Sequence, residues 1–250
     1  MKDYFKKILV VVLVIVAVFS IYQIGDYIAI NVRFDEELEE IQTQKTEETA
    51  IPSTVQKISK KPDEMSPNEA ERIRRLQALY PDLVGWITIV GTEIDFPLMY
   101  SENNYFYLDH NYKGEYHPFG TPYIDAGNRT DFTDQNTVIY GHNVRSGKVF
   151  HDLTQYMDKE FVEKASEICI STSQGVLRYE IFAAYVADPY DNFRSPTYEG
   201  EAKATFLAEI GEKNLLDKDV PKDVKNFLTL QTCLDDNKRL VIHGKIQTNL

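Results

Sequence analysis

An apolar segment near the N-terminus constrains this chain most, because a run of that length needs a membrane or a large core around it. "ILVVVLVIVAVFSIYQIG" extends from Ile8 to Gly25 with almost no polar side chain. As an α-helix it would be about 27 Å long, close to the roughly 30 Å hydrocarbon core of a bilayer. Lysines precede the run and acidic residues follow it. The pattern predicts a transmembrane anchor over residues 8–30, with residues 1–7 in the cytoplasm and the remainder outside.

A cleaved signal peptide is the alternative interpretation of this segment. Ala17 and Ser20 are small, as a cleavage site requires, but Val18 and Phe19 lie between them and the apolar run is long. These features favour the uncleaved anchor.

The chain after the anchor divides into a polar stretch and a folded domain. Residues 31–65 are acidic and poor in aromatic side chains, which predicts an extracellular stalk that is partly helical near the membrane. The domain spans residues 66–250. Its first element is predicted to be a helix with Ser66 as N-cap and an end before Pro81. Its apolar stripe consists of Ile73, Leu76 and Leu79.

Short β-rich runs then replace the helical period. "GWITIVGTEIDFPLMY" predicts a hairpin turning at Gly91-Thr92, and "EICISTSQGVLRYEIFAAYVAD" predicts a second pair of strands. Further strands are predicted in "GTPYIDAG", "NTVIYGHNV", "NFLTLQTC" and "RLVIHGKI". Seven or eight short strands indicate a mainly β fold, either a closed barrel or a sandwich with helical insertions.

Two segments between the strands have helical character. "GKVFHDLTQYMDKEFVEKA" places Val149, Leu153, Tyr156 and Met157 on one side of a predicted helix. A polar insert of about 35 residues before the last two strands contains "GEAKATFLAEIGEKNLL", which also permits a helix.

Composition limits the partners and cofactors. The net charge of −12 argues against nucleic acid or an anionic lipid surface as the main partner. Cys169 and Cys233 are the two cysteines, and outside the cell they could pair as a disulfide; we expect instead a buried thiol at Cys169 with no bridge. No C-x-x-C motif is present, so we predict no zinc site and no other cofactor.

Cys233 ends the strand "TLQTC", and strand alternation gives its direction. Leu228, Leu230 and Thr232 share one face, whereas Thr229, Gln231 and Cys233 share the other. If the leucines fill the core, Cys233 and Arg239 both point outward near the ends of neighbouring strands. A guanidinium stabilises a nearby thiolate, as a nucleophile requires. Alternation alone leaves a small apolar plug as an equal possibility.

Cysteine chemistry on a peptide also needs a proton donor for the leaving amine. His142 lies in "YGHN", where a strand gives way to a loop, a location that suits a functional side chain. An ordinary surface histidine is the alternative. His243, on the Arg239 face of the last strand, is the second candidate.

"TLQTC", the downstream arginine in "RLVIHGK", the upstream "YGHN" and the N-terminal anchor together resemble the sortases of Gram-positive bacteria, over roughly residues 70–250. Sortases are membrane-anchored cysteine transpeptidases that attach proteins to the cell wall. The helical start before "GWITI" and the helical insert before the cysteine strand are most similar to class B. The resemblance implies a closed sortase-like β-barrel of seven to eight strands with N-terminal helices.

The resemblance also implies roles for particular residues. Cys233 would be the nucleophile, His142 the general acid, and Arg239 the group that binds the substrate carbonyl and its oxyanion. "NNYFYLDH" resembles the class B segment that lines the peptide groove, so Asn104 and Leu108 would bind substrate, with Tyr140 bordering the same groove. Many class B members have a serine where this chain has Gln231. A longer amide beside the nucleophile would alter contacts with the sorting signal, so this difference affects the expected substrate preference and not the expected chemistry.

Partners follow from the same resemblance. The acyl donors would be secreted proteins carrying a C-terminal sorting signal, with class B analogy suggesting an N-P-x-T-x type, and the acceptor would be an amine of a peptidoglycan precursor. A pilin polymerase that uses a subunit lysine, a peptidase that transfers the acyl group to water, and a non-catalytic anchored scaffold are the alternatives.

Overall fold

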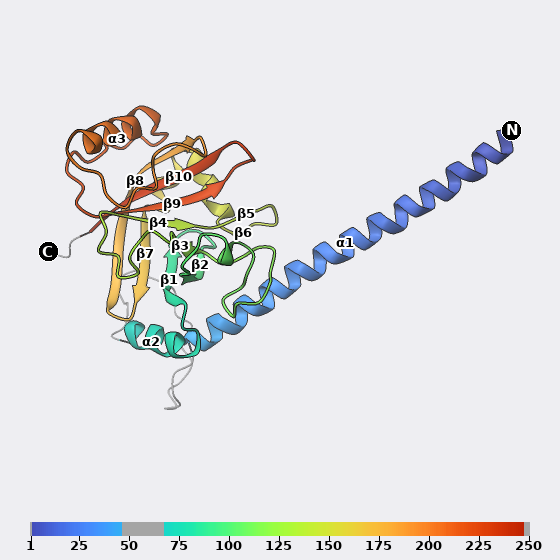
Figure 1. The fold of residues 1–250 in the computed structure, drawn as a ribbon, viewed down its shortest axis with the longest axis horizontal. Helices are drawn as coiled ribbons and strands as arrows, with labels where there is room; N and C mark the ends of the chain where they lie inside the picture. The colour runs from blue at the N-terminus through green and yellow to red at the C-terminus, as the bar shows by residue number, and fades with distance from the viewer. Residues whose placement is uncertain (1, 47–67, 248–250) are drawn as a thin grey trace. The chain divides into compact units, whose positions relative to one another are not determined.

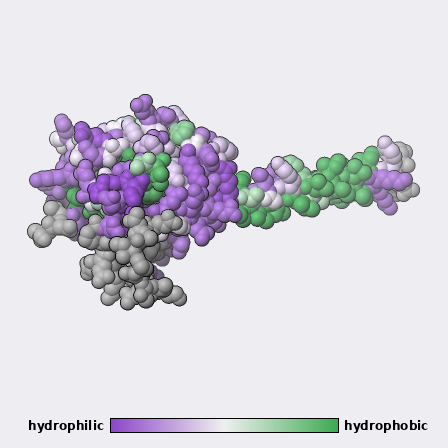
Figure 2. Space-filling view, turned by 90° about the horizontal axis from the view of Figure 1, so that it is seen from below, coloured by the Kyte–Doolittle hydropathy of each residue, from purple (hydrophilic) through white to green (hydrophobic). Residues whose placement is uncertain are grey.

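The computed structural model describes residues 2–46 and 68–247, in two compact units that divide between Gln42 and Thr43. Helix α1 (Lys2–Thr46) accounts for the first unit. By length and composition α1 is able to cross a membrane. Its large apolar side chains are exposed from Ile8 to Ile28 and account for the mostly green, hydrophobic surface of the helix in Figure 2. The helical part of the predicted stalk extends to Thr46, while residues 47–65 and the expected N-cap Ser66 lie outside the described residues.

The second unit is built on a closed barrel of eight strands, as the sortase resemblance implied (Figure 1). The strands are β1 (Leu83–Ile89), β2 (Asp95–Met99), β3 (Tyr123–Ile124), β4 (Asn136–Tyr140), β7 (Glu167–Thr172), β8 (Gly175–Ala187), β9 (Phe227–Cys233) and β10 (Arg239–Ile246). They follow the order β1-β2-β3-β4-β9-β10-β8-β7 around the barrel. A two-stranded sheet, β5 (Asn143–Val144) and β6 (Lys148–Val149), lies outside it.

Both predicted hairpins are present. β1 pairs antiparallel with β2, and β7 with β8. Gly91 in the first turn has φ 93°, and an added Cβ would lie 2.9 Å from the Lys164 carbonyl oxygen, so glycine is required there. β9 and β10 are antiparallel neighbours, whereas β4 runs parallel to β9. The parallel pair matters for function, because it brings the ends of two strands distant in sequence to the same edge.

The helices differ from expectation in detail. α2 (Glu69–Leu79) ends before Pro81 as predicted and buries Ile73 and Leu76, but Leu79 is 62% exposed. The segment predicted as one helix around Leu153 forms β6 and two 3-10 helices, η2 (His151–Met157) and η3 (Phe161–Glu163). Val149 adopts φ 56°, which an α-helix does not allow, and Met157 is exposed. The predicted helical insert is α3 (Gly200–Lys213).

The last two strands bury both of their faces. Leu228, Leu230 and Thr232 are fully buried on one face of β9, as alternation predicted. The opposite face is also covered along most of its length, by an apolar cluster that includes Phe206 and Ile210. Both residues belong to α3, the helix at the top of Figure 1. At the Cys233 end of this outer face, Cys233 and Arg239 are half-buried. The fold therefore leaves one end of β9 accessible, beside the end of β4.

Candidate active site

Three strand ends meet at Cys233. Arg239 on β10 is the direct antiparallel partner of Cys233, so the two side chains share one face. On the other side, Tyr140 of β4 pairs with Gln231 in a parallel register, and two further residues along each chain bring His142 beside Cys233. The structure thus groups the three predicted catalytic residues on adjacent strand ends.

Hydrogen bonds join the β4 and β9 ends just before the two functional side chains. The Gly141 amide donates to the Gln231 carbonyl at 3.2 Å, and the buried Thr232 hydroxyl donates to the Gly141 carbonyl at 2.8 Å. Because these bonds fix the residues immediately preceding His142 and Cys233, the relative position of imidazole and thiol is set by the barrel.

His142 also contacts the loop that precedes β3. Its Nε2 lies 2.8 Å from the Leu108 carbonyl oxygen, an acceptor, so this nitrogen carries the proton. The His142 carbonyl in turn accepts a hydrogen bond from the Phe150 amide at 2.9 Å. The imidazole is therefore held at Nε2 by Leu108 of η1 (Phe106–Leu108), and the His142 backbone is held by Phe150, which immediately precedes η2.

Arg239 closes the short turn between β9 and β10. Its Nη1 donates to the carbonyl oxygens of Asp235 and Lys238, each at 3.1 Å, and lies 3.5 Å from that of Asp236. The guanidinium has five N–H donors, and one nitrogen makes all three contacts. Among the described residues the other guanidinium donors have no hydrogen-bond partner.

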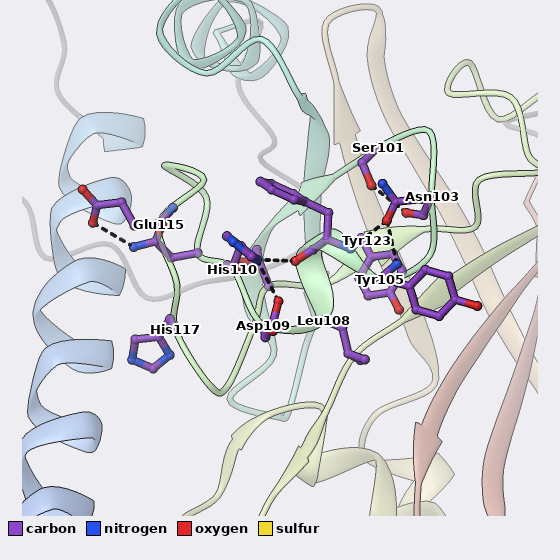
Figure 3. A network of polar contacts seen from close by, with 12 residues as sticks. Ser101, Asn103, Tyr105, Leu108, Asp109, His110, Glu115, His117 and Tyr123 are labelled. Carbon is purple, nitrogen blue, oxygen red and sulfur yellow. Dashed lines mark hydrogen bonds and ion pairs between the residues drawn. The ribbon is translucent and has the colours of Figure 1, made fainter.

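Leu108 belongs to the segment from Ser101 to Thr121, which is held by its own hydrogen bonds. Asn103 Oδ1 accepts hydrogen bonds from the Tyr105 and Phe106 amides, and the His110 ring contacts the Phe106 carbonyl and Asp109 (Figure 3). Figure 3 shows the Leu108 side chain pointing away from His110, and this side chain is 39% exposed. The predicted groove residue Leu108 therefore presents its carbonyl to His142 and an apolar surface to solvent.

Asp125 links the other two predicted groove residues. One carboxylate oxygen accepts hydrogen bonds from the Tyr140 hydroxyl at 2.5 Å and from the Asn104 amide at 3.0 Å. The Asn104 side-chain oxygen accepts from the Ala126 amide, so both ends of that side chain are engaged within the protein. Burial and then Asp125 raise the pKa of Tyr140, which keeps its hydroxyl protonated as a donor.

Tyr123 completes this row beside the sulfur. Its hydroxyl donates to the Asn104 carbonyl at 2.9 Å, and its ring lies 5.3 Å from that of Tyr140. Burial, then the charge of Asp125 and then the proximity of Cys233 raise the pKa of Tyr123. Tyr123, Tyr140 and Gln231 are thus neighbours on β3, β4 and β9, and all three are largely buried.

The structure excludes the second histidine candidate. His243 is fully buried, and its ring nitrogens contact the Tyr185 hydroxyl and Thr229 Oγ1 at 3.1 and 2.9 Å. Burial lowers its pKa to about 3. We expected the face of β10 that carries Arg239 and His243 to point outward to solvent. At His243 this expectation was wrong, because α3 covers that part of the strand. Within residues 2–46 and 68–247, no three His, Cys, Asp or Glu side chains are grouped to hold a metal ion.

The two cysteines differ in exposure, and this difference predicts their reactivity. Both are free, with Cys233 half-buried and Cys169 buried on β7 as expected. Burial, followed by Glu167, raises the pKa of Cys169 to about 12. Because the thiolate is the reactive form, iodoacetamide should modify one thiol in the native protein and two after unfolding. Mass spectrometry checks the count, and native labelling of Cys169 or an intramolecular disulfide would contradict it.

Gly141 is predicted to be essential for placing His142. An added Cβ would lie 2.5 Å from the Phe150 ring, which is fully buried. Gly141→Ala should cost about 1–3 kcal/mol of unfolding free energy through overpacking. It should also lower kcat/KM at least about tenfold, since the adjacent imidazole moves.

A second glycine provides the control for that change. In α3 a Cβ at Gly211 would meet its nearest neighbour at 3.9 Å, so Gly211→Ala should keep full activity and add up to about 1 kcal/mol. Thermal unfolding and steady-state kinetics measure both effects. Wild-type kcat/KM in the Gly141 variant would show that this close contact does not position the histidine.

Three further residues of the site were not anticipated from sequence. Asp125 connects to partners 15 and 21 positions away, Arg194 to Gln231 over 37 positions, and Asn136 to Thr229 over 93. Each is an ordinary polar residue in a strand end or loop, with no local pattern to distinguish it. For Asn136 alone the sequence offers an indication, because this residue begins the segment "NTVIYGHN" that contains His142.

Comparisons with known proteins agree with this arrangement. A Sortase domain model matches residues 94–247. Sortase B of Listeria monocytogenes is 36% identical over 187 residues, covering 71% of this chain and 75% of that protein. Sortase B of Staphylococcus aureus is 30% identical over 177 residues, covering 68% and 72%. The solved S. aureus sortase B–substrate complex is similar with a TM-score of 0.67 and 29% identity, covering 72% of this chain and 87% of that one.

The matched residues include the ends of β4, β9 and β10, where His142, Cys233 and Arg239 lie. Cell-surface cysteine transpeptidases share this barrel, and α1 fits the single-pass anchor of such an enzyme. The chain belongs to the sortase family and is a class B sortase.

Proposed function

We propose that this enzyme cleaves a C-terminal sorting signal of secreted proteins and transfers the acyl group to an amine of a peptidoglycan precursor. The observation that carries the proposal is the meeting of thiol, guanidinium and imidazole at three adjacent strand ends, with Arg239 directly paired to Cys233. In this proposal residues 8–30 anchor the enzyme in the cell membrane, with its catalytic domain on the extracellular side. Secreted proteins and lipid-linked precursors both occur there.

The first half-reaction forms a thioester. The Cys233 thiolate attacks the scissile carbonyl carbon, and Arg239 donates charge-assisted hydrogen bonds to the resulting oxyanion. One donor at a comparable site is worth about 2.7–4 kcal/mol. Protonated His142 gives its proton to the leaving amine as the C–N bond breaks. Asn104, Leu108 and Tyr140 line the groove in which the signal peptide lies.

The second half-reaction restores an amide. The incoming amine attacks the thioester carbon and loses a proton to neutral His142, and the Cys233 thiolate leaves. The cycle regenerates both groups, so the chemistry draws on no nucleotide or external redox partner. A thioester keeps enough acyl-transfer potential for this step because sulfur is a good leaving group.

The acceptor is tested by product analysis. The full chain in detergent micelles, given an Asn-Pro-Ala-Thr-Ala peptide and triglycine, should yield the triglycine amide as main product, with slower hydrolysis when the amine is omitted. Release of free acid at the same rate with and without amine would show that the enzyme acts as a peptidase and not as a transpeptidase. A preference for a lysine side-chain amine over triglycine would instead favour pilin polymerisation.

A further inference from the structure

Gln231 lies on β9 close to the proposed nucleophile, Cys233. It lies two residues before Cys233 on the same face of β9, and beside Tyr140 in the register with β4. The side chain is 8% exposed. A carboxamide in such a position has a carbonyl end and an amine end, and each requires a different kind of partner.

Arg194 determines which end of this amide faces the site. Its Nη2 donates a hydrogen bond to Gln231 Oε1 at 2.7 Å. A guanidinium has donors only, so the carbonyl end must face it and the NH2 end must face away. Among the described residues, none accepts a hydrogen bond from Gln231 Nε2, and this atom is not sealed from solvent. The two N–H donors of Gln231 Nε2 therefore have no protein acceptor among the described residues.

The Arg194 side chain is held in place before any substrate binds. Asn136, which is fully buried, donates from Nδ2 to the carbonyl oxygens of Phe193 and Ser195, the two neighbours of Arg194. Arg194 Nη1 also donates to the Pro189 carbonyl at 2.8 Å, and its guanidinium carbon lies 4.0 Å from the centre of the Phe193 ring. Because backbone and side chain are both fixed, the orientation of the Gln231 amide is preorganised.

The distance from Cys233 indicates what the free donors reach. Two residues along a strand are about 6.6 Å apart, and both side chains project from the same face. A glutamine side chain bridges most of that separation. A peptide whose scissile carbonyl is at the sulfur therefore places the side chain of the carbonyl-bearing residue within reach of the Gln231 amide.

We propose that Gln231 is a specificity-determining residue that donates a hydrogen bond to an oxygen of the side chain beside the scissile bond, and that Arg194 is its positioning residue. This inference rests on the proposed function in one respect, that the acyl donor is a peptide. The site selects a hydroxyl or carboxamide oxygen at that position over an alkyl group of the same size, because an alkyl group leaves both donors unpaired.

Binding without chemistry gives the first test. In the full chain carrying Cys233→Ala, we expect Asn-Pro-Ala-Thr-Ala to bind about tenfold more tightly than Asn-Pro-Ala-Val-Ala, which replaces the hydroxyl with a methyl group. Adding Gln231→Met removes both donors and leaves no side-chain oxygen to which the threonine hydroxyl could donate instead, so the two affinities should then agree within about twofold. A preference that persists in this variant, no preference with Gln231 present, or no binding of the threonine peptide overturns the proposal.

Arg194 variants test the positioning role. Arg194→Lys also has donors only and should retain the threonine preference, whereas Arg194→Met frees the amide to rotate and should lose it. In the active enzyme, Gln231→Met should raise KM for the threonine peptide about tenfold and lower kcat less than threefold. Equal preference in the two Arg194 variants would overturn the positioning role. Since the binding test contains no nucleophile, absent turnover with an intact threonine preference counts against the proposed function alone.

Discussion

Replacing Cys233 with alanine is expected to abolish turnover while leaving the fold intact. The sulfur is the proposed nucleophile at the meeting point of β4, β9 and β10, so kcat should fall by about 10⁴-fold or more. The side chain is half-buried and lies at a strand end, so unfolding free energy should change by less than about 1 kcal/mol. Steady-state kinetics and thermal unfolding of the full chain measure the two effects.

Cys169→Ala is the matched control for this change. Cys169 lies on β7, three strands from β9 in the barrel order, and is buried. Its replacement should retain near-normal turnover and cost about 1 kcal/mol of stability. Normal turnover in the Cys233 variant would remove Cys233 from the mechanism, whereas loss in both variants would point to a folding defect.

Replacing Arg239 with lysine is expected to lower kcat/KM by about 10²–10³-fold, although the positive charge is retained. The arginine uses one nitrogen for the turn carbonyls of Asp235 and Lys238, and in the proposed mechanism its other donors bind the substrate oxygen. An ammonium group is a single point and cannot serve the turn and the oxyanion in the same geometry. The loss should appear mainly in kcat, because the oxyanion exists only near the transition state.

Arg74→Lys provides the comparison. Arg74 lies on α2, where it donates to the Ser173 carbonyl and to Glu71, and its side chain is 53% exposed. This change should leave kcat within about twofold, and single-turnover kinetics of both variants separate acylation from product release. A rate near that of the wild type in Arg239→Lys would show that a point charge suffices and that the planar fork is not used.

The parts of the fold that follow from local patterns were predictable. The two hairpins, the alternating last strands and the stop before Pro81 depend on residues close in sequence, and the structure contains all of them. The predicted catalytic residues also lie together. Alternation placed Cys233 and Arg239 on one face, and the parallel pairing of β4 with β9 then adds His142.

Features set by distant contacts were not predictable in the same way. The helical period around Leu153 gave no indication that Val149 would adopt φ 56° and divide the segment. His243 shared the functional face by alternation, but α3, from a separate part of the chain, covers it. The contact between Arg194 and Gln231 depends on Asn136 holding both neighbours of Arg194, which no sequence period reveals.

The central claim is that Cys233 carries an acyl group between two amines, and the intact mass of the enzyme tests it most directly. The full chain mixed with Asn-Pro-Ala-Thr-Ala and quenched in acid should gain the mass of the acyl fragment, bound to the peptide containing Cys233, and triglycine should discharge that adduct. Turnover with no adduct at Cys233, or with an adduct that triglycine does not remove, would contradict the account.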